Sequence, residues 1–467
     1  MARASSLASV VIDVGEESEE LPRPEPDTPF RILVVGDFTG GSGRNRRAIE
    51  VDRDNFDQVL ARLAPSLRLA FGKVELPLAF RELEDFHPDR LFERLPPFQA
   101  LRGLRRRLSD ESTFREAAAQ MLPPELPKNA ETANLSGADL LSAMMGDGPG
   151  ETPRASAQAP ARSSDWDRML GEMVSKYTKP KPDPRQPELI AQTDTAITGE
   201  MRVVLHHPAF QSLEAAWRAL YFLVRRLETG DELKIFVMDL PSEELFTAEG
   251  LAALRRVVVT EGTGTIGAEP WALIAGLYSF SSEHEGVLAQ IAAIARTAGA
   301  PFLSGLGPSV VGLQGVFDEL RKSAAARWVG LAMPRFLLRQ PYGKNSDETE
   351  TFAFEEMPTP VEHERYLWGN PAIAIAYLLG ESFSRYGWEL RPGVLRDVDG
   401  LPLHLYQHDG EKVLKPCAEI LMTEEVAEVL MDRGFMPLAS IKGTDTVRVV
   451  RFQSIASPSA ALAGRWV

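Results

Sequence analysis

The sequence contains a single cysteine, Cys417, and no apolar run of membrane-spanning length. One thiol excludes an intrachain disulfide and a metal site built from several cysteines, and it fits a reducing compartment. The best candidate for an apolar span, IAIAYLL, is far too short to cross a bilayer. The first residues, MARASSLASVVIDVGEESEE, lack the apolar core of a signal peptide. The sequence therefore predicts a soluble, cytoplasmic protein.

Catalytic signatures are equally scarce, since both the H-E-x-x-H zinc motif and the G-x-S-x-G nucleophile elbow are absent. His206 and His207 are adjacent before Pro208, so they cannot share one helical face as metal ligands at i and i+4 do. Glu355 and Glu356 are also neighbours, and adjacent residues of a strand point to opposite faces. We predict no catalytic, cofactor-binding or metal-binding residue, and we expect an interaction protein rather than an enzyme.

Basic residues are fewer than acidic ones: the sequence has 51 Lys and Arg and 66 Asp and Glu, which gives a formal net charge of -15. Sequence-independent binding to nucleic acid depends on basic surface that displaces counterions. Anionic membrane surfaces likewise attract basic segments. Neither nucleic acid nor a membrane is therefore expected as a partner.

The first feature that is present is a strand followed by a glycine-rich turn, in FRILVVGDFTGGSGRNRRAIEVDRDNF, residues 30–56. The β-branched run that ends at Gly36 predicts a buried strand. The spacing from Gly36 to Gly41 matches a phosphate-binding loop, but Ser42 stands where that loop needs its lysine. No third glycine completes a dinucleotide fingerprint either. A nucleotide-binding enzyme that uses this turn is kept only as an alternative to a packing turn.

Composition divides the 467 residues into four segments, and the fold class that we expect is mixed α/β. Residues 1–29 are acidic and end in prolines, as an extended arm does. Residues 30–122 and 165–467 predict two α/β domains, each long enough for its own core. Residues 123–164 are rich in Pro, Ala, Gly and Ser, which predicts a flexible linker.

Two short stretches outside the domains have a pattern of their own. In the arm, SVVIDVG alternates Val10, Ile12 and Val14, as a strand that pairs with a partner elsewhere does. In the linker, GADLLSAMMGDG is an amphipathic helical patch, whose apolar residues are Leu140, Leu141, Met144 and Met145. That patch is either a docking motif or an apolar stretch without a function.

Helical periodicity is clearest in HPAFQSLEAAWRALYFLVRRLE, where steps of three and four residues predict one buried stripe: Phe210, Leu213, Trp217, Leu220, Val224 and Leu227. Strands are expected at LKIFVMD and WALIAGLY, and helices at HEGVLAQIAAIARTAG and NPAIAIAYLLGESFSRYG. Asp52 or Asp54 is expected to cap the helix that contains DNFDQVLARLA. A basic cluster either binds an anion or forms a solvated, paired face: Arg102, Arg105, Arg106 and Arg107.

The first domain resembles the small subunit (TssB/VipA-like) of the type VI secretion contractile sheath. The resemblance lies in PFRILVVGDFTGG, in IEVDRDNFDQVLARLAPSLRLAF and in LAFRELEDFHPDRLFERLPPFQALRGLRRRL. Its matching positions are Gly36 and Asp37, where the strand ends, and DRDNF at the helix start, which includes Asp54 and Phe56. The resemblance implies that the glycine-rich turn is a packing element.

The second domain resembles the large subunit (TssC/VipB-like) of the same sheath in four ordered blocks: LHHPAFQSLEAAWRALYFLV, ARWVGLAMPRFLLRQPYG, FAFEE, and LWGNPA with SRYGW. The resemblance implies family packing positions at Trp217, Pro334, Arg335, Arg339, Pro341, Tyr342, Gly343 and Trp368. Large subunits usually continue well beyond the segment found here at residues 453–458, whereas this sequence ends at Val467. The resemblance thus implies a small–large sheath fusion with a shortened C-terminus.

As a member of this family the chain would be a structural protomer without a cofactor. It would polymerise with copies of itself or related sheath subunits around an Hcp-like inner tube, meet baseplate components, and contract to drive secretion. In the family an arm strand is exchanged between protomers, here Val10, Ile12 and Val14. A short helix near the start of the large subunit binds a Clp-type AAA+ unfoldase (ClpV-like), here Leu140, Leu141, Met144 and Met145. An accessory or baseplate-proximal component is the alternative within the class.

Overall fold

The computed structural model describes residues 24–41, 46–71, 74–121, 183–262, 269–310, 312 and 315–466. Contacts divide these residues into two compact units. The first unit combines 24–91 with 200–466, and the second combines 92–121 with 183–199. Both expected domains contribute to both units, so the compact units do not coincide with the segments 30–122 and 165–467. The predicted exchange strand and the apolar linker patch lie outside the described residues.

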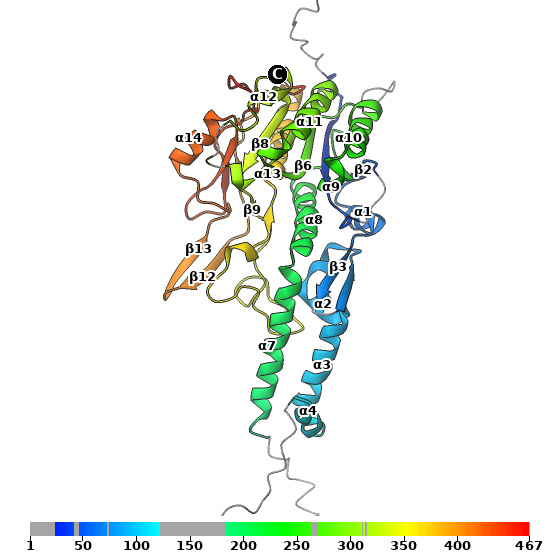
Figure 1. The fold of residues 1–467 in the computed structure, drawn as a ribbon, viewed down its shortest axis with the longest axis vertical. Helices are drawn as coiled ribbons and strands as arrows, with labels where there is room; N and C mark the ends of the chain where they lie inside the picture. Colours follow the sequence, from blue (N-terminus) through cyan, green and yellow to red (C-terminus); the bar gives the residue numbers. More distant parts are fainter. Residues whose placement is uncertain are drawn as a thin grey trace, which may run out of the picture. The chain divides into compact units, whose positions relative to one another are not determined.

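Within the described part of the first unit, nine strands form one sheet in the order β11-β15-β14-β8-β7-β6-β1-β5-β2 (Figure 1). The strands are β1 (Phe30–Gly36), β2 (Ile49–Val51), β5 (Leu233–Asp239), β6 (Leu273–Phe280), β7 (Phe302–Leu306), β8 (Val329–Met333), β11 (Asp397–Val398), β14 (Met436–Ser440) and β15 (Val447–Val449). From β14 to β5 the neighbouring strands run parallel, and the outer strands pair antiparallel.

Strand β1 lies in the middle of this sheet, between β6 and β5, although it comes from the other end of the chain. Ile32 pairs with Ile235 on one side and with Leu273 on the other. All but one of its seven residues are buried, as is typical of a central parallel strand. Through β1 and β2 the small-subunit-like segment therefore contributes to the same sheet as the large one.

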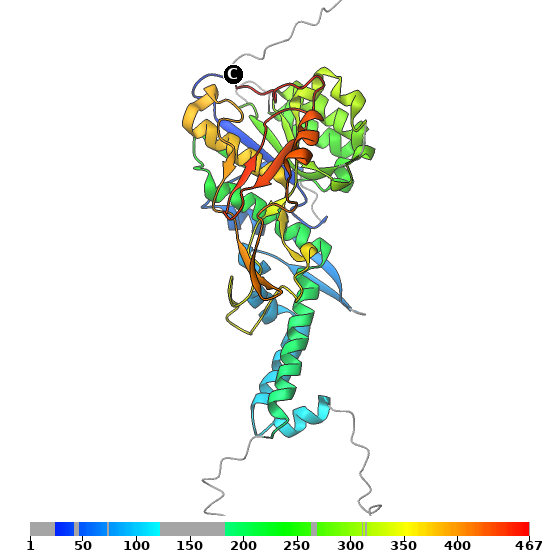
Figure 2. The same ribbon diagram turned by 90° about the vertical axis from the view of Figure 1, so that its left-hand side faces the viewer.

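Helices cover both faces of the sheet (Figure 2). On one face α10 (Ala248–Arg255) and α11 (Glu285–Ala298) share a core cluster with Leu33 and Val35 of β1. On the other face α13 (Pro371–Tyr386) packs against β1, β6 and α8 (Pro208–Arg226). A strand that is apolar on both faces and helices with one apolar stripe account for this layering. The mixed α/β class is confirmed.

The buried stripe predicted on α8 is also confirmed, since its six residues are at most 2% exposed. The predicted strands and helices correspond to β5, β6, α11 and α13. The predicted cap of α1 (Phe56–Leu63) is wrong, because the N-cap is Asn55. Asp52 instead accepts hydrogen bonds from the backbone N–H groups of Asp54 and Asn55, and so closes the turn before the helix.

Smaller elements complete the first unit. The described residues also form three two-stranded sheets. They pair β3 (Ser66–Phe71) with β4 (Val74–Ala79), β9 (Phe336–Leu337) with β10 (Trp368–Gly369), and β12 (His404–His408) with β13 (Glu411–Lys415). The remaining helices are α2 (Pro88–Arg94, at the boundary of the units), α9 (Ser242–Leu245), α12 (Asp318–Arg321) and α14 (Glu424–Asp432). Short turns of 3-10 helix are η1 (Leu83–Phe86), η3 (Ser282–His284), η4 (Pro308–Val310), η5 (Ala324–Trp328), η6 (His363–Arg365) and η7 (Gly387–Glu389), and η2 (Arg256–Glu261) is a π-helix.

The second unit is helical, built from α3 (Pro96–Ser109), α4 (Phe114–Met121) and the first part of α7 (Gln186–Leu205). Its small core consists of Leu108, Phe114, Ala117, Ala118 and Leu189. The basic cluster on α3 is partly paired, because Arg105 binds Asp194 of α7 and Arg107 donates to Gln120. Pairing with nearby polar groups was one of the two alternatives for this cluster.

Candidate functional site

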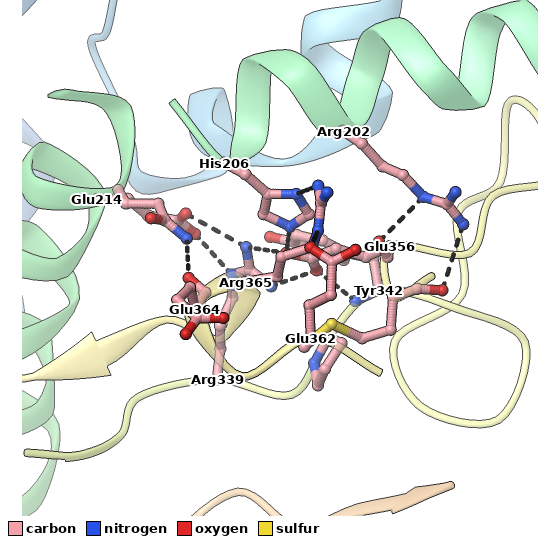
Figure 3. Close-up of polar contacts among 12 residues, drawn as sticks. Arg202, His206, Glu214, Arg339, Tyr342, Glu356, Glu362, Glu364 and Arg365 are labelled. Atoms are coloured by element: carbon pink, nitrogen blue, oxygen red, sulfur yellow. Dashed lines mark hydrogen bonds and ion pairs between the residues drawn. The ribbon is translucent and has the colours of Figure 1, made fainter. Parts of the chain in front are cut away.

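A cluster of buried polar groups in the first unit is centred on Arg339, which follows β9 (Figure 3). Its guanidinium lies between two buried carboxylates. Nε donates to Glu214 Oε1 at 2.8 Å, and Nη1 and Nη2 donate to Glu356 Oε2 and Oε1 at 2.7 and 3.0 Å. The fork of an arginine matches a carboxylate in this bidentate way. The loop that carries Glu356 is thereby fastened to α8, which carries Glu214.

A second arginine balances the charge of this cluster. Arg218, one turn after Glu214 on α8, donates to Glu214 Oε1 at 2.7 Å and to the hydroxyl of Tyr342 at 2.9 Å. The ring of Tyr342 lies 4.3 Å from the guanidinium carbon of Arg339. Two guanidinium groups therefore face two carboxylates, an arrangement that buried ion pairs need if they are not to destabilise the fold.

Electrostatics keep the cluster charged. Burial alone would raise the pKa of Glu356, but attraction to Arg339 and hydrogen bonds from His206 and Arg339 outweigh it and lower the pKa to about 2. Burial opposes the charge of Arg339 as well, yet Glu214 and Glu356 raise the pKa of its guanidinium. Burial raises the pKa of Tyr342, so its hydroxyl stays protonated. None of these groups changes its charge near neutral pH.

The junction between α7 and α8 adds further contacts to the cluster (Figure 3). His206 Nδ1 lies 2.8 Å from Arg365 Nη1, and its Nε2 lies 3.3 Å from Glu356 Oε1. Because a guanidinium can only donate, His206 Nδ1 accepts this hydrogen bond, and Nε2 is the ring nitrogen that faces the carboxylate of Glu356. Arg202 donates to the backbone carbonyl groups of Glu355, Glu356 and Met357.

The polar groups of this cluster are paired with one another. Among the described residues only Arg31 and Arg465 have a buried side-chain nitrogen without a partner, and neither belongs to the cluster. The pKa values of Glu356, Arg339 and Tyr342 are all displaced away from neutrality, so these three groups are poorly suited to exchange a proton near pH 7. Its arrangement serves to hold the loop 339–357 against the α7–α8 junction.

In the described part of the glycine-rich turn after β1, carboxylates accept the backbone N–H groups. Asp37 Oδ1 accepts the N–H groups of Thr39, Gly40 and Gly41, at 3.1, 2.8 and 3.0 Å. The buried carboxylate of Asp239 accepts the N–H of Phe38 at 2.9 Å. A phosphate-binding loop must offer its N–H groups to the ligand, whereas here two carboxylates already occupy them and would repel an anion.

Arg46 completes the turn from the other side. Its guanidinium donates to Asp239 Oδ2 at 2.9 Å and pairs with Glu244, so the charge of Arg46 is already compensated by these acids. The indole N–H of Trp217 donates to the carbonyl of Phe38 at 3.0 Å, which ties the turn to α8. The contacts support the packing turn and offer no support for the nucleotide site.

A cavity of about 780 Å³ opens at the carboxyl ends of β1 and β6. The chain leaves β1 toward β5 and leaves β6 toward β7, in opposite directions along the sheet. Open α/β sheets bind ligands at such a switch point. Small residues of α8 line the cavity on one side, namely Ala215, Ala216 and Ala219, and the aromatic side chains are Phe246, Tyr278, Tyr366 and Trp368.

Acidic residues dominate the charge of this cavity. Four carboxylates line it, from Asp37, Glu243, Glu364 and Glu419. The single lining arginine, Arg335, already makes two hydrogen bonds to Glu419, at 2.8 and 2.5 Å. The cavity therefore differs from the Arg339 cluster, because its charges are not balanced by its own residues.

The hairpin β12–β13 is attached to the wall of this cavity through its first and last residues. His404 and Lys415, which pair across the hairpin, contact Tyr366 OH and His363 Nδ1 at 2.7 and 2.8 Å. Burial lowers the pKa of both histidines, and Lys415 lowers that of His363 further. The rest of the hairpin is largely exposed, with Leu405 62% accessible.

The structure places most of the family packing positions in these regions. Phe56, Trp217, Arg339, Tyr342 and Trp368 are buried, whereas Asp54 is exposed and contributes only its backbone N–H. Gly36 approaches Leu277 so closely that a Cβ would lie 3.0 Å from its Cβ. Asp37, Arg335 and Trp368 line the cavity, Pro334 follows β8, and Pro341 and Gly343 shape the loop after Arg339.

Sequence reasoning missed Glu214, Glu356 and His206 as members of one cluster. A signal existed for Glu214, because it lies four residues after Phe210 and three before Trp217, inside the apolar stripe. A charged residue on a buried face predicts a buried partner. The sequence could not identify that partner, because Arg339 lies 125 residues further along the chain.

Within the described ranges, no group of three or more His, Cys, Asp or Glu side chains could hold a metal ion. A search of the same residues found no helix with the length and hydropathy needed to cross a membrane.

Comparison with known proteins gives two family matches. Residues 17–121 match the type VI secretion system VipA family (VC_A0107 or Hcp2). Residues 187–318 and 314–456 match the EvpB/VC_A0108 tail sheath N-terminal domain. The type VI secretion system sheath protein TssC1 of Pseudomonas aeruginosa is 34% identical over 306 residues, which cover 58% of this chain and 61% of that relative. The match thus spans less than two thirds of the relative's length.

Proposed function

From the premise that this chain belongs to the type VI secretion tail-sheath family, we propose that it is a structural protomer of a contractile sheath. The observation that carries the proposal is the joining of both family matches in one chain, whose strands share one sheet through β1. Residues 30–122 correspond to a small subunit and 165–467 to a large one. Fusion fixes their one-to-one ratio in every protomer.

The work of such a protomer is mechanical and involves no covalent chemistry. Copies of the chain polymerise helically around an inner tube in the cytoplasm, and an extended lattice relaxes to a compact one. A protomer must remain folded while its contacts to neighbours change. The Arg339 cluster supports this role, because it locks the loop 339–357 to α8 with balanced buried charge.

The arm would tie the lattice together. Val10, Ile12 and Val14 would add a strand to a sheet of a neighbouring protomer, with backbone hydrogen bonds for affinity and apolar side chains for register. Each buried side chain of this size contributes about 1.5–3 kcal/mol before ordering costs. Deletion of residues 1–16 should leave a folded protein that no longer forms tubes.

Further partners follow from the same role. An Hcp-like tube protein would fill the sheath, and baseplate components would start its assembly. A ClpV-like unfoldase would recognise Leu140, Leu141, Met144 and Met145 in contracted sheaths. Replacement of Leu141 and Met145 by alanine should abolish unfoldase binding without preventing assembly.

Negative-stain electron microscopy of the purified chain tests the proposal directly. Tubes or rings of regular repeat are expected, with assembly that depends on salt because the chain carries a net charge of -15. Incorporation only into tubes of a separate sheath pair would instead indicate an accessory component. A chain that stays monomeric under all conditions, alone and with an inner tube protein, would contradict both roles.

A further inference from the structure

The acidic cavity at the ends of β1 and β6 has more negative charge than its own residues neutralise. With Arg335 bound to Glu419, three further carboxylates line it: Asp37, Glu243 and Glu364. Asp37 is engaged by the amides of its own turn. Glu243 and Glu364 have no ion-pair partner among the described residues, and both side chains belong to exposed residues. A cation from outside the unit would balance them.

We propose that this cavity is a docking site for the lysine-rich segment at residues 176–181 of a second copy of the chain. The inference rests on the proposed function, in which copies of the chain assemble. The inference adds to that function by naming the surface of one copy and the segment of the next copy that binds there. Neither the family resemblance nor the matches to known proteins assign a role to this cavity.

The walls of the cavity suit an extended peptide with cationic and aromatic side chains. Its volume of about 780 Å³ is that of a ligand pocket, too small for a folded domain. The alanines of α8 allow a peptide backbone to approach closely, and Phe246 and Trp368 offer apolar and aromatic contact. Ammonium groups are attracted both to carboxylates and to aromatic rings.

The segment KYTKPK has the complementary chemistry. It contains three of the eleven lysines of the chain within six residues, and no acidic residue occurs from Met173 to Pro182. In a chain with a net charge of -15 such a run is unusual. Prolines at 180 and 182 disfavour helix in the residues before them and favour extended backbone. Tyr177 supplies an aromatic side chain between two lysines.

The reach of the chain favours a second copy as the donor. The segment precedes α7, which has 20 residues and is therefore about 30 Å long, and α8 with its cavity residues follows α7. Lys179 and Lys181 lie within seven residues of the start of α7, a span of at most about 24 Å when fully extended. The segment cannot extend back along α7 to lie in full in the cavity of its own chain.

A peptide experiment tests the docking site without requiring a sheath. A fluorescently labelled peptide of residues 173–182 is titrated into the full chain, and binding is followed by fluorescence anisotropy. Saturable binding that weakens with added salt is expected. The double variant Glu243→Gln with Glu364→Gln should weaken it about five-fold or more, in line with the loss of two exposed charge contacts. Glu249→Gln, an exposed acid on α10 outside the cavity, should change it less than about two-fold.

Charge exchange in the full chain tests whether the contact joins two copies. Replacing Lys176, Lys179 and Lys181 by glutamate should weaken self-association measured by sedimentation velocity, as should Glu243→Lys with Glu364→Lys. Mixing these two variants should restore association, because the unchanged lysine-rich segment of the second variant can bind the unchanged acidic cavity of the first.

Absence of peptide binding, or equal binding by the cavity and control variants, would overturn the docking site even if the parent forms tubes. Peptide binding without restoration on mixing would overturn the second copy as donor. Tubes that fail to form in the parent would count against the proposed function alone.

Discussion

Two polar regions of the first unit, the Arg339 cluster and the acidic cavity, use similar residue types in opposite ways. In the cluster, two arginines face two glutamates, and the glutamates are at most 1% exposed. In the cavity, four carboxylates face one arginine and the surface is open. Buried charge must be balanced within the fold, whereas open charge can be left for a partner. The balance of charge thus separates a region that holds the protein together from one that is suited to binding.

The strongest test of this contrast removes one partner from each region. Arg339→Met should lower the free energy of unfolding by about 3–5 kcal/mol, because Glu214 and Glu356 would be left buried with less compensation. Arg335→Met, which breaks the more exposed pair with Glu419, should cost less than about 1 kcal/mol. Urea denaturation of both variants measures the difference. Equal losses would show that the cluster is no more structural than the cavity.

The Arg339 cluster should lose stability at strongly acidic pH. The pKa of Glu356 is lowered from 4.5 to about 2 in the folded protein, so the unfolded chain binds its proton first as pH falls. This stabilisation, of the order of 3 kcal/mol, is complete above pH 4.5 and is lost between about 4.5 and 2. Unfolding free energies measured across this range should show the loss. Glu356→Gln should flatten the profile, whereas Glu364→Gln at the cavity should leave it unchanged.

The packing turn beside the cavity should resist a larger side chain. Gly36→Val places a Cβ 3.0 Å from the Cβ of Leu277, so we expect a loss of about 1–3 kcal/mol in stability together with reduced solubility. Gly286→Ala on α11, where a Cβ meets nothing within 4 Å, is the matched control. Thermal unfolding of the two variants distinguishes them. A Gly36→Val protein as stable as the parent would mean that the Leu277 side chain can shift without loss of stability.

The hairpin at the cavity wall should loosen at mildly acidic pH. Since the pKa of His363 and of His404 is lowered below 6.5 in the folded state, the unfolded chain takes up these protons first. Their contribution is complete above pH 6.5 and declines as pH falls toward the folded-state values. Amide hydrogen exchange in β12 and β13, corrected for intrinsic rates, should quicken between pH 7.5 and 5.5. His404→Phe should reduce this pH dependence.

The smallest expected effect on stability belongs to the cavity acids. Glu243→Gln should change the free energy of unfolding by less than about 0.5 kcal/mol, as exposed substitutions usually do. The same variant should nevertheless weaken association between copies. A stability loss comparable to that of Arg339→Met would mean that the cavity is part of the structural framework.

The sequence by itself determined the local elements and the family. Strand β1 was predictable from a continuous β-branched run and the stripe of α8 from apolar spacing near 3.6 residues, because both patterns are properties of neighbours in the chain. The Gly36 turn could be separated from a phosphate loop because one lysine was missing. The ordered motif blocks indicated the sheath family for the same reason, since each block is contiguous.

Only the tertiary structure decided which distant residues meet. The position of β1 between β6 and β5 joins segments about 200 residues apart, as the bond from Phe38 to Asp239 shows, and no local pattern specifies a strand's neighbours. Glu214 finds Arg339 across 125 residues. The cavity arises where two crossovers diverge, a property of strand order rather than of any motif. Long-range pairing is set by the total burial and charge balance of the fold, and these quantities exist only once the chain is packed.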